Sequence, residues 1–206
     1  GKSINRLVYQ NKLNQQFVFT TREDLDLSNF KNVRNFIEKK QFDVIINCAA
    51  YTFVDKAETE KEEANLLNNL AVKNIAEIAK DNKIKLIHIS TDYVFDGLKF
   101  ESYDETDNTS PLNVYGKSKR DGENSILSIM NFNATIIRTS WVYSLYGNNF
   151  VDSILKLCKK NDKLNVVSDQ IGSPTNANDL ASAVISIINS KIFSETVQLS
   201  GIFHYS

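Results

Sequence analysis

The sequence has few of the residues that build metal and disulfide sites. It contains two cysteines, Cys48 and Cys158, far apart within apolar segments, and two histidines, His88 and His204. A zinc site needs a cluster of such ligands, and the sequence has no Cys/His cluster. We therefore expect the cysteines to be buried free thiols in a reducing cytosol, and the histidines to be core or edge residues of strands.

The chain also lacks a charge bias and a long apolar run. Its formal net charge is −1, which gives no electrostatic reason to bind a nucleic acid polymer or an anionic membrane. No apolar run approaches the length of a membrane span, and the first residues do not resemble a signal peptide. Hydrophobic residues make up 42% of the chain, as in an ordinary soluble globular protein. We expect a cytoplasmic location.

Methionine and glycine are both scarce where a dinucleotide-binding chain should begin. The only methionine is Met130, so we expect the chain to be a piece of a longer protein. No G-x-G-x-x-G motif occurs, although such a turn normally follows the first strand of a dinucleotide-binding sheet. We therefore expect that first strand to be missing and its two neighbours to lack a partner. Unpaired strand edges lower solubility or favour a homodimer.

Short apolar runs rich in β-branched residues alternate with longer segments of helical period. The pattern predicts strands at residues 17–20, 43–50, 85–90, 134–140, 164–167 and 196–200. It predicts helices at residues 3–13, 28–40 with Ser28 as the N-cap, 57–81, 112–130, 148–161 and 177–190. This alternation predicts an α/β fold, a Rossmann-like doubly wound parallel sheet with helices on both faces. Because such sheets bind ligands beyond the carboxyl ends of their strands, we expect the crevice at "CAAYT", "STDY" and "RTSWVY".

Tyr115 and Lys119 stand four positions apart in a predicted helix and so share one face. A phenol has a pKa of about 10 in water, and a nearby ammonium lowers it. Such a tyrosine can protonate a carbonyl oxygen as hydride reaches its carbon, while a hydroxyl such as that of Thr91 holds the same oxygen. With eight tyrosines in the chain, the probability that one Tyr-x-x-x-Lys pattern occurs by chance is about one half. The position one strand after "ISTDYVFDG" favours the catalytic interpretation.

Longer stretches carry a specific resemblance. The chain resembles the extended short-chain dehydrogenase/reductases, and within them the dTDP-4-dehydrorhamnose reductase family. The matching stretches, in the family's order and spacing, are "DVIINCAAYTFVDKAE" (43–58), "HISTDYVFDG" (88–97), "SPLNVYGKSKRDGE" (110–123), "RTSWVYSLYGNNF" (138–150) and "DQIGSPT" (169–175).

The resemblance implies roles for individual residues. Tyr115 matches the family's proton donor. Lys119 matches the lysine that lowers the pKa of that tyrosine and holds the nicotinamide ribose. Thr91 matches the hydroxyl that adjusts the pKa of the tyrosine and contacts the substrate. Besides Tyr115 and Lys119, the positions that match contacts to the NADPH or NADH cofactor are Gly1, Lys2, Ser3, Asp26, Leu27, Ala50, Tyr51 and Thr52. The positions that match the surroundings of the dTDP-sugar substrate are Thr91, Asp92 and Trp141.

The residues alone leave alternatives open for several positions. Asp26 could be a turn residue, and Trp141 could belong to the core. Glu123 is better explained as a helix-surface charge. Asp55 and Glu58 suit the start of a helix, where carboxylates oppose the dipole.

The chain departs from the family at both ends. Ile4 falls where the family has the last glycine of its phosphate loop, and its side chain would crowd a pyrophosphate. The family also continues into a substrate-binding lobe beyond the end of this sequence. We therefore divide the chain into a dinucleotide-binding Rossmann-like domain without its first strand, residues 1–140, and a partial substrate-binding region, residues 141–206. We expect residues 1–206 alone to bind NADPH weakly.

The resemblance implies an NAD(P)H-dependent oxidoreductase that reduces the C4 keto group of dTDP-4-dehydro-6-deoxy-L-mannose to give dTDP-L-rhamnose. Two alternatives stay open. The first is another sugar-nucleotide enzyme, although 4,6-dehydratases carry an Asp-Glu pair after the threonine where this chain has Asp92 and Tyr93. The second is a binding protein similar to the regulatory subunit of methionine adenosyltransferase.

Overall fold

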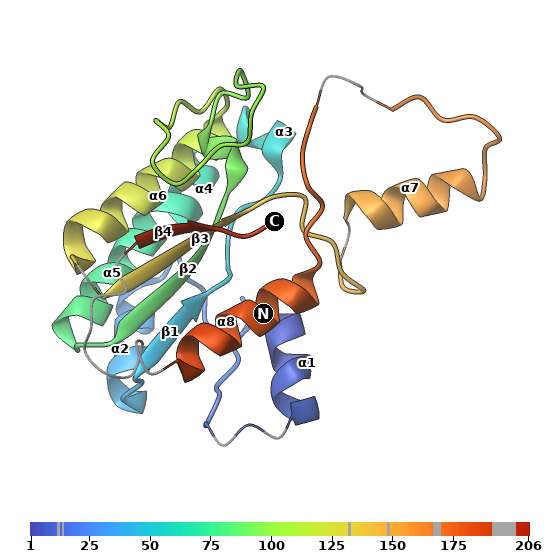
Figure 1. The fold of residues 1–206 in the computed structure, drawn as a ribbon. Coiled ribbons are helices and arrows are strands. Elements are labelled where there is room, and N and C mark those ends of the chain that lie inside the picture. Colours follow the sequence, from blue (N-terminus) through green and yellow to red (C-terminus); the bar gives the residue numbers. More distant parts are fainter. Residues whose placement is uncertain (12, 14, 132, 148, 167–169, 191–200) are drawn as a thin grey trace.

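The sheet is parallel and lies at the centre of the molecule (Figure 1). The computed structural model describes residues 1–206 except 12, 14, 132, 148, 167–169 and 191–200. Within that part of the chain, four parallel strands pair in the order β1-β2-β3-β4, with bounds Val44–Asn47, Lys85–Thr91, Ala134–Thr139 and Gly201–His204. The register places Ile46 beside Ile87, so the carboxyl ends of β1 and β2 meet at one edge.

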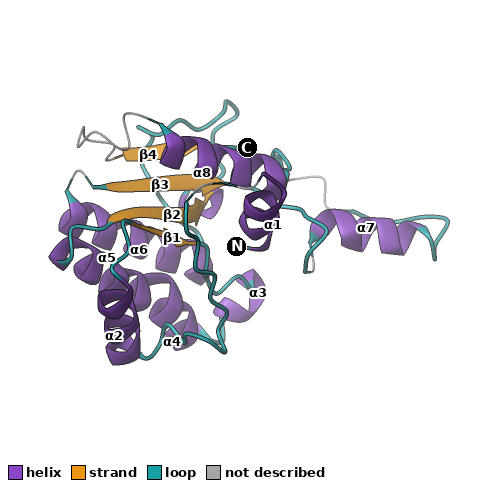
Figure 2. Ribbon diagram, turned by 90° about the horizontal axis from the view of Figure 1, so that it is seen from below, coloured by secondary structure: helices purple, strands orange, loops and turns teal. Residues whose placement is uncertain are grey.

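Helices cover both faces of this sheet (Figure 2). One face carries α1 and α8, which span Lys2–Asn11 and Ala177–Asn189, and the other carries α2, α5 and α6, which span Phe30–Lys40, Ala71–Asp81 and Val114–Met130. Successive residues of a strand point to opposite faces. Leu86 therefore packs in the cluster under α2, α5 and α6, while Ile87 packs under α1 and α8. The predicted doubly wound α/β fold is confirmed.

The long helix predicted over residues 57–81 is interrupted. It consists of α4 (Lys61–Asn65), a π-helical turn (Leu66–Leu70) and α5, and a short α3 (Val54–Ala57) precedes it. Single π-helical turns inside helices often mark functional sites. Here the turn places the fully buried Asn68 against α6, where its Nδ2 donates to Ser118 Oγ at 3.0 Å.

Gly122 lets α6 approach this π-helical turn closely. A Cβ added to Gly122 would lie 2.1 Å from the carbonyl oxygen of Asn68. We expect Gly122→Ala to lower the free energy of unfolding by about 1–3 kcal/mol through overpacking, although alanine favours helices. Denaturant unfolding measures this, with Asn124→Ala on the exposed face of α6 as the matched control. A Gly122→Ala protein as stable as the wild type would show that the two helices separate freely.

Several predicted elements are wrong. Residues 17–20 are described without strand structure, since a strand forms only beside a partner. The N-cap of α2 is Asn29, whose side chain accepts from Asn32 N, whereas Ser28 donates to Asp26. Residues 164–166 form no strand, and Val167 lies outside the described residues, as does the strand predicted at 196–200.

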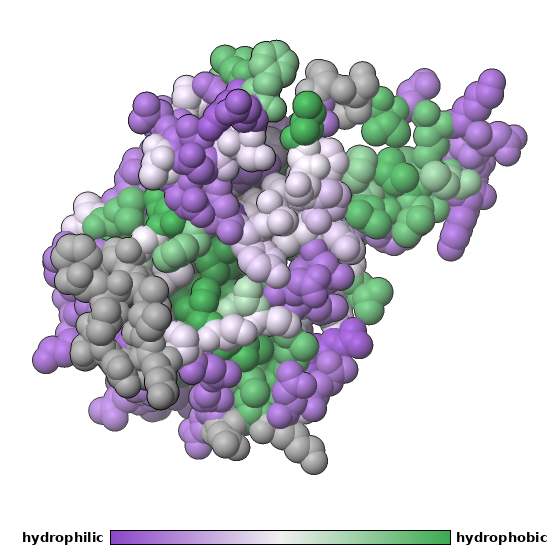
Figure 3. Space-filling model, in the orientation of Figure 1, coloured by the Kyte–Doolittle hydropathy of each residue, from purple (hydrophilic) through white to green (hydrophobic). Residues whose placement is uncertain are grey.

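Helix α7 (Phe150–Cys158) projects away from the sheet (Figure 1) and has no buried residue. Its apolar side chains gather on the surface (Figure 3), where Phe150, Leu155 and Leu157 are exposed. Both cysteines are free and exposed. The expected burial of the thiols is wrong because Cys48 lies beyond the last residue of β1 and Cys158 ends this projecting helix. None of the described helices is long and apolar enough to cross a membrane.

Candidate active site

The site begins where β2 ends. Thr91, its last residue, caps a 3-10 turn over Asp92–Val94: its hydroxyl oxygen accepts from Tyr93 N at 3.2 Å and the hydroxyl donates to Asp92 Oδ1 at 3.1 Å. Burial raises the pKa of the Asp92 carboxyl, which the Thr91 hydrogen bond opposes. Hydroxyl and carboxyl are therefore held at the edge where the sheet is expected to bind ligands.

Helix α6 starts directly against this turn. Asn113 caps it by accepting from Gly116 N at 2.7 Å, and the Glu58 carboxylate accepts from Val114 N at 2.9 Å. Glu58 therefore serves the start of α6 and not of its own helix. A Cβ on Gly116 would lie 2.1 Å from the carbonyl oxygen of Tyr93. The absence of a side chain at Gly116 brings Tyr115, in the first turn of α6, to the end of β2.

Tyr115 is enclosed by aromatic and small residues. Its ring meets Tyr93 edge-on at 5.6 Å and packs in one cluster with Tyr51, Ala57 and Ala64. Burial raises the pKa of the phenol to about 12, and a hydrogen bond with Thr91 acts in the opposite direction. The expectation that a neighbouring ammonium lowers this pKa is not met in this structure: burial raises the pKa, and the opposing effect comes from Thr91. The phenol therefore carries its proton at neutral pH.

Lys119 lies one turn along α6, with a side chain that is only 2% exposed. Its Nζ donates to the carbonyl oxygen of Ile89 at 2.7 Å and lies 3.3 Å from His88 Nε2. Burial lowers the pKa of Lys119 to about 8, while Glu123 and Cys48 act to raise it. The lysine therefore changes charge much closer to neutral pH than an exposed lysine does.

Glu123 is a buried partner of Arg138 and not a surface charge. Nε and Nη2 of Arg138, on β3, donate to the carboxylate of Glu123 on α6, at 3.1 and 2.7 Å. The guanidinium also lies 5.0 Å from the centre of the Phe95 ring. The prediction of a solvated charge is wrong because this side of α6 faces β3. The ion pair ties the helix that carries Tyr115 and Lys119 to the sheet.

Residues expected at the cofactor lie at the end of β1. Tyr51 N donates to Asn68 Oδ1 at 2.9 Å, and the Tyr51 hydroxyl donates to Glu60 at 2.6 Å. Tyr51 shares the cluster of Tyr115, so the fold brings the segment from Ala50 to Thr52 to the proposed proton donor. Thr52 lines a cavity of about 620 Å³ together with Phe150 and other residues of α3 and α7.

Trp141 follows β3 in a strained backbone conformation. Its φ of 45° lies in the left-handed region, which is unusual for a bulky side chain and costs about 1–3 kcal/mol. The indole lies 5.3 Å from the Phe150 ring and presses on Gly172, where a Cβ would come within 2.9 Å. Such strain often accompanies a binding site, and here it aims the indole towards α7.

The remaining predicted residues are spread more widely. Gly1 directly precedes α1, and Lys2 and Ser3 are the first residues of this helix, whose N-terminus lies at the end of the sheet where the strand arrows end (Figure 1). Asp26 accepts two hydrogen bonds from Ser28 in a turn, as the alternative interpretation has it. Leu27 packs against the core cluster under α2.

The side chain of Ile4 is 5% exposed and packs with Ile87 and Ile137 against the sheet. This side chain is therefore part of the core.

Sequence reasoning missed two buried polar residues beside the site, Asn47 and Asn68, and it gave no functional role to His88, which lies in the core on β2 as expected. Their signal was present, because Asn47 and His88 interrupt otherwise apolar strands and buried polar groups need partners. Within the described part of the chain, no group of three or more His, Cys, Asp or Glu is placed to hold a metal ion.

Curated relatives match most of the chain. A dTDP-4-dehydrorhamnose reductase of Sinorhizobium fredii is 48% identical over 90% of this chain and 62% of its own length. Another from Aggregatibacter actinomycetemcomitans is 44% identical over 100% of this chain and 69% of its own. The chain thus spans roughly two thirds of the length of these relatives.

A solved structure agrees with the fold described above. The dTDP-4-dehydrorhamnose reductase of Bacillus anthracis, in complex with NADP, superimposes with a TM-score of 0.90 at 37% identity, covering 100% of this chain and 70% of that one. The model of the RmlD substrate binding domain family matches residues 1–206. The chain belongs to the RmlD substrate binding domain family.

Proposed function

We propose that the protein carrying this sequence reduces the C4 keto group of dTDP-4-dehydro-6-deoxy-L-mannose to give dTDP-L-rhamnose, with NADPH or NADH as the reductant. The observation that carries the proposal is the buried Tyr115 phenol, which lies in the first turn of α6 against the turn that follows Thr91 and whose pKa burial raises to about 12. A general acid must hold its proton until the reacting oxygen becomes basic. The names of the relatives supply the sugar.

The residues divide the work as follows. NADPH or NADH, when bound, would supply the hydride that C4 of the sugar receives. Tyr115 gives its proton to the C4 oxygen, which thereby becomes the C4 hydroxyl group of the product. Thr91 holds that oxygen by a hydrogen bond, and Lys119 holds a ribose hydroxyl of the cofactor. Asp92 and Trp141 flank the sugar nucleotide.

The described residues fit a dinucleotide on two grounds. Tyr51, in the segment Ala50–Thr52, shares a cluster with Tyr115, which suits the nicotinamide end. The backbone N–H groups of Lys2 and Ser3, which begin α1 directly after Gly1, have no intrahelical acceptor, and such groups bind pyrophosphate. We propose that Asp26 and Leu27 contact the adenosine end. We also propose that residues 1–140 form the dinucleotide-binding domain and residues 141–206 part of the substrate-binding region.

Tyr93 argues against dehydration. A 4,6-dehydratase needs a carboxylate there, and Tyr93 instead places its ring against Tyr115. A tyrosine with a pKa raised by burial cannot replace that carboxylate as a base at neutral pH.

Cofactor binding tests the proposed role of Lys119. In the protein carrying this sequence, Lys119→Met should weaken NADPH binding roughly tenfold or more, since a hydrogen bond from a charged group is lost. Titration followed by NADPH fluorescence measures the affinity. Lys117→Met, an exposed lysine on the same helix, is the matched control and should bind as the wild type does. Equal affinity in both variants would remove Lys119 from the cofactor site, and no binding by the wild type would contradict the reductase proposal.

A further inference from the structure

A chain of buried polar groups runs from β1 through β2 to Lys119. Asn47 Nδ2 lies 3.1 Å from His88 Nδ1, and His88 Nε2 lies 3.3 Å from Lys119 Nζ. The exposed fractions of the three side chains are 6%, 0% and 2%. Without water to exchange partners, each contact must pair one donor with one acceptor. The positions of the protons can therefore be worked out.

The deduction starts at Asn47. The backbone N–H of Ala49 donates to Asn47 Oδ1 at 3.1 Å, and a backbone N–H can act only as a donor. The oxygen of the amide must therefore face Ala49, which leaves its NH₂ group facing His88. Because an NH₂ group only donates, His88 Nδ1 must be the acceptor.

The ring of His88 is neutral, since an accepting Nδ1 carries no proton and burial holds the pKa of the ring well below its usual value. A neutral imidazole carries one N–H. With Nδ1 accepting, that N–H lies on Nε2 and points at Lys119 Nζ. An ammonium has three donors and no acceptor, so it would oppose this N–H, whereas a neutral amine accepts from it and still donates to Ile89.

We propose that Asn47 and His88 are positioning residues that fix the Nε2–H tautomer and thereby favour the neutral amine of Lys119 in the site without ligand. All four hydrogen bonds, from Ala49 to Asn47, Asn47 to His88, His88 to Lys119 and Lys119 to Ile89, are satisfied together only in that state. A protonated Lys119 leaves at least one of them broken.

Other charged and titratable groups near Lys119 compete with this arrangement. Glu123 on α6 and Cys48 beyond β1 favour the ammonium, but the carboxylate of Glu123 is paired with Arg138. Tyr115 is uncharged. The neutral amine has two N–H groups, so it can donate to a ligand hydroxyl while it donates to Ile89 and accepts from His88. This contact with a ligand rests on the proposed reductase function, whereas the tautomer of His88 does not.

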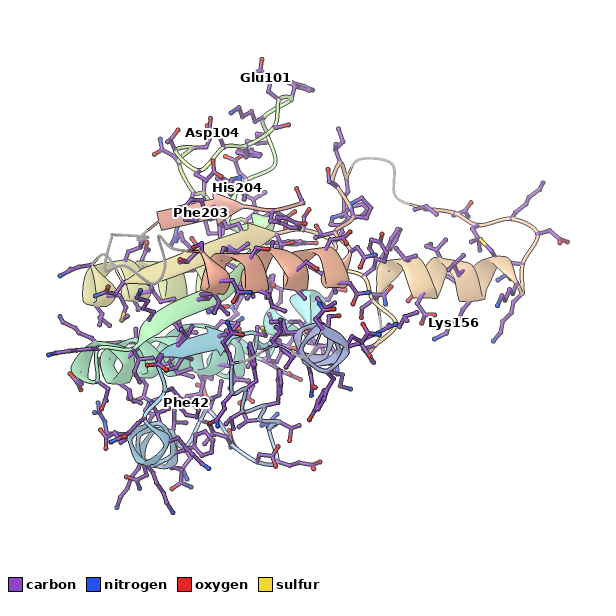
Figure 4. All side chains as sticks on the ribbon, turned by 60° about the horizontal axis from the view of Figure 1, so that its bottom comes forward. Phe42, Glu101, Asp104, Lys156, Phe203 and His204 are labelled. Carbon is purple, nitrogen blue, oxygen red and sulfur yellow. The ribbon has the colours of Figure 1, made fainter. Side chains whose placement is uncertain are left out.

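Nitrogen NMR of the 206-residue chain tests the proposal directly. The wild type should show the His88 proton on Nε2. His204 provides an internal reference: it lies on β4 beneath the loop of Glu101 and Asp104 (Figure 4), with Nδ1 3.2 Å from the Tyr103 carbonyl oxygen. Since a carbonyl only accepts, His204 should carry a proton on Nδ1. A His204→Gln variant assigns the two rings.

Asn47→Asp should reverse the direction of the hydrogen bonds between residue 47, His88 and Lys119, while the shape of the side chain at position 47 hardly changes. One carboxylate oxygen still accepts from Ala49, while the other accepts from His88 Nδ1–H, which frees Nε2 to accept from the ammonium. The titration midpoint of the Lys119 Nζ signal, assigned with Lys119→Arg, should rise by roughly one pH unit or more. Cys48→Asp is the control for charge: it should raise the midpoint but leave the His88 proton on Nε2.

Three results would overturn the inference: a wild-type His88 proton on Nδ1, a wild-type Lys119 midpoint at the ordinary value of about 10.4, or the same His88 tautomer in wild type and Asn47→Asp. The first two need no variant, so a misfolded Asn47→Asp protein leaves the inference testable. None of these measurements involves cofactor or sugar. A chain with the expected tautomer but no reductase activity would contradict the proposed function alone.

Discussion

Tyr115→Phe should lower turnover of the keto sugar by roughly a hundredfold to ten-thousandfold, the usual contribution of a general acid. The substitution keeps the ring, which packs edge-on against Tyr93, and removes the transferable proton. The affinity for NADPH should change little, because Lys119 and the end of β1 are untouched. Steady-state turnover, with cofactor affinity measured separately by fluorescence, checks both parts.

Tyr93→Phe is the matched control for Tyr115→Phe. It removes a hydroxyl from the neighbouring ring at 5.6 Å, but no role in proton transfer is proposed for it. Its turnover should stay near that of the wild type. If Tyr115→Phe also turns over like the wild type, another group donates the proton and the proposed role of Tyr115 is wrong.

Glu123→Ala should lower the free energy of unfolding by about 3–5 kcal/mol, because it leaves the charge of Arg138 buried without its partner. The guanidinium is 4% exposed and makes its ion pair through Nη2 at 2.7 Å. Solvent therefore cannot replace the lost carboxylate. Denaturant unfolding of the 206-residue chain measures the change.

The double variant Glu123→Leu with Arg138→Met separates the loss of the ion pair from the cost of leaving the Arg138 charge buried without a partner. Exchanging a whole buried ion pair for apolar side chains is often neutral or stabilising by about 1–4 kcal/mol. We therefore expect the double variant to be more stable than Glu123→Ala alone. A loss of under about 1 kcal/mol in Glu123→Ala would be typical of an exposed pair and would contradict the burial described here.

Local sequence was sufficient to predict the strands and helices whose own hydrophobic pattern shows which side chains are buried. The strand predicted at 43–50 and the helix predicted at 112–130 both form, as β1 (Val44–Asn47) and α6 (Val114–Met130), because their patterns match a buried strand and an amphipathic helix. Residues 17–20 have the composition of a strand but form none, since pairing depends on a partner that local sequence does not reveal. The same limit hid the π-helical turn, which packs Asn68 against Gly122.

The proposed site was predictable in position but not in electrostatics. Spacing placed Tyr115 and Lys119 on one face of α6 and Thr91 at the end of β2. It could not give the burial that raises the pKa of the phenol and lowers that of the lysine. Glu123 was misjudged for the same reason, because a charge on a helix looks solvated until the facing strand supplies Arg138.

Transfer of deuterium from NADPH labelled at the reactive carbon of its nicotinamide to the sugar tests the central claim most directly. With dTDP-4-dehydro-6-deoxy-L-mannose and the protein carrying this sequence, we predict dTDP-L-rhamnose labelled at C4, and almost no product with Tyr115→Phe. Bound NADPH without labelled product, or label at a carbon other than C4, would contradict the account.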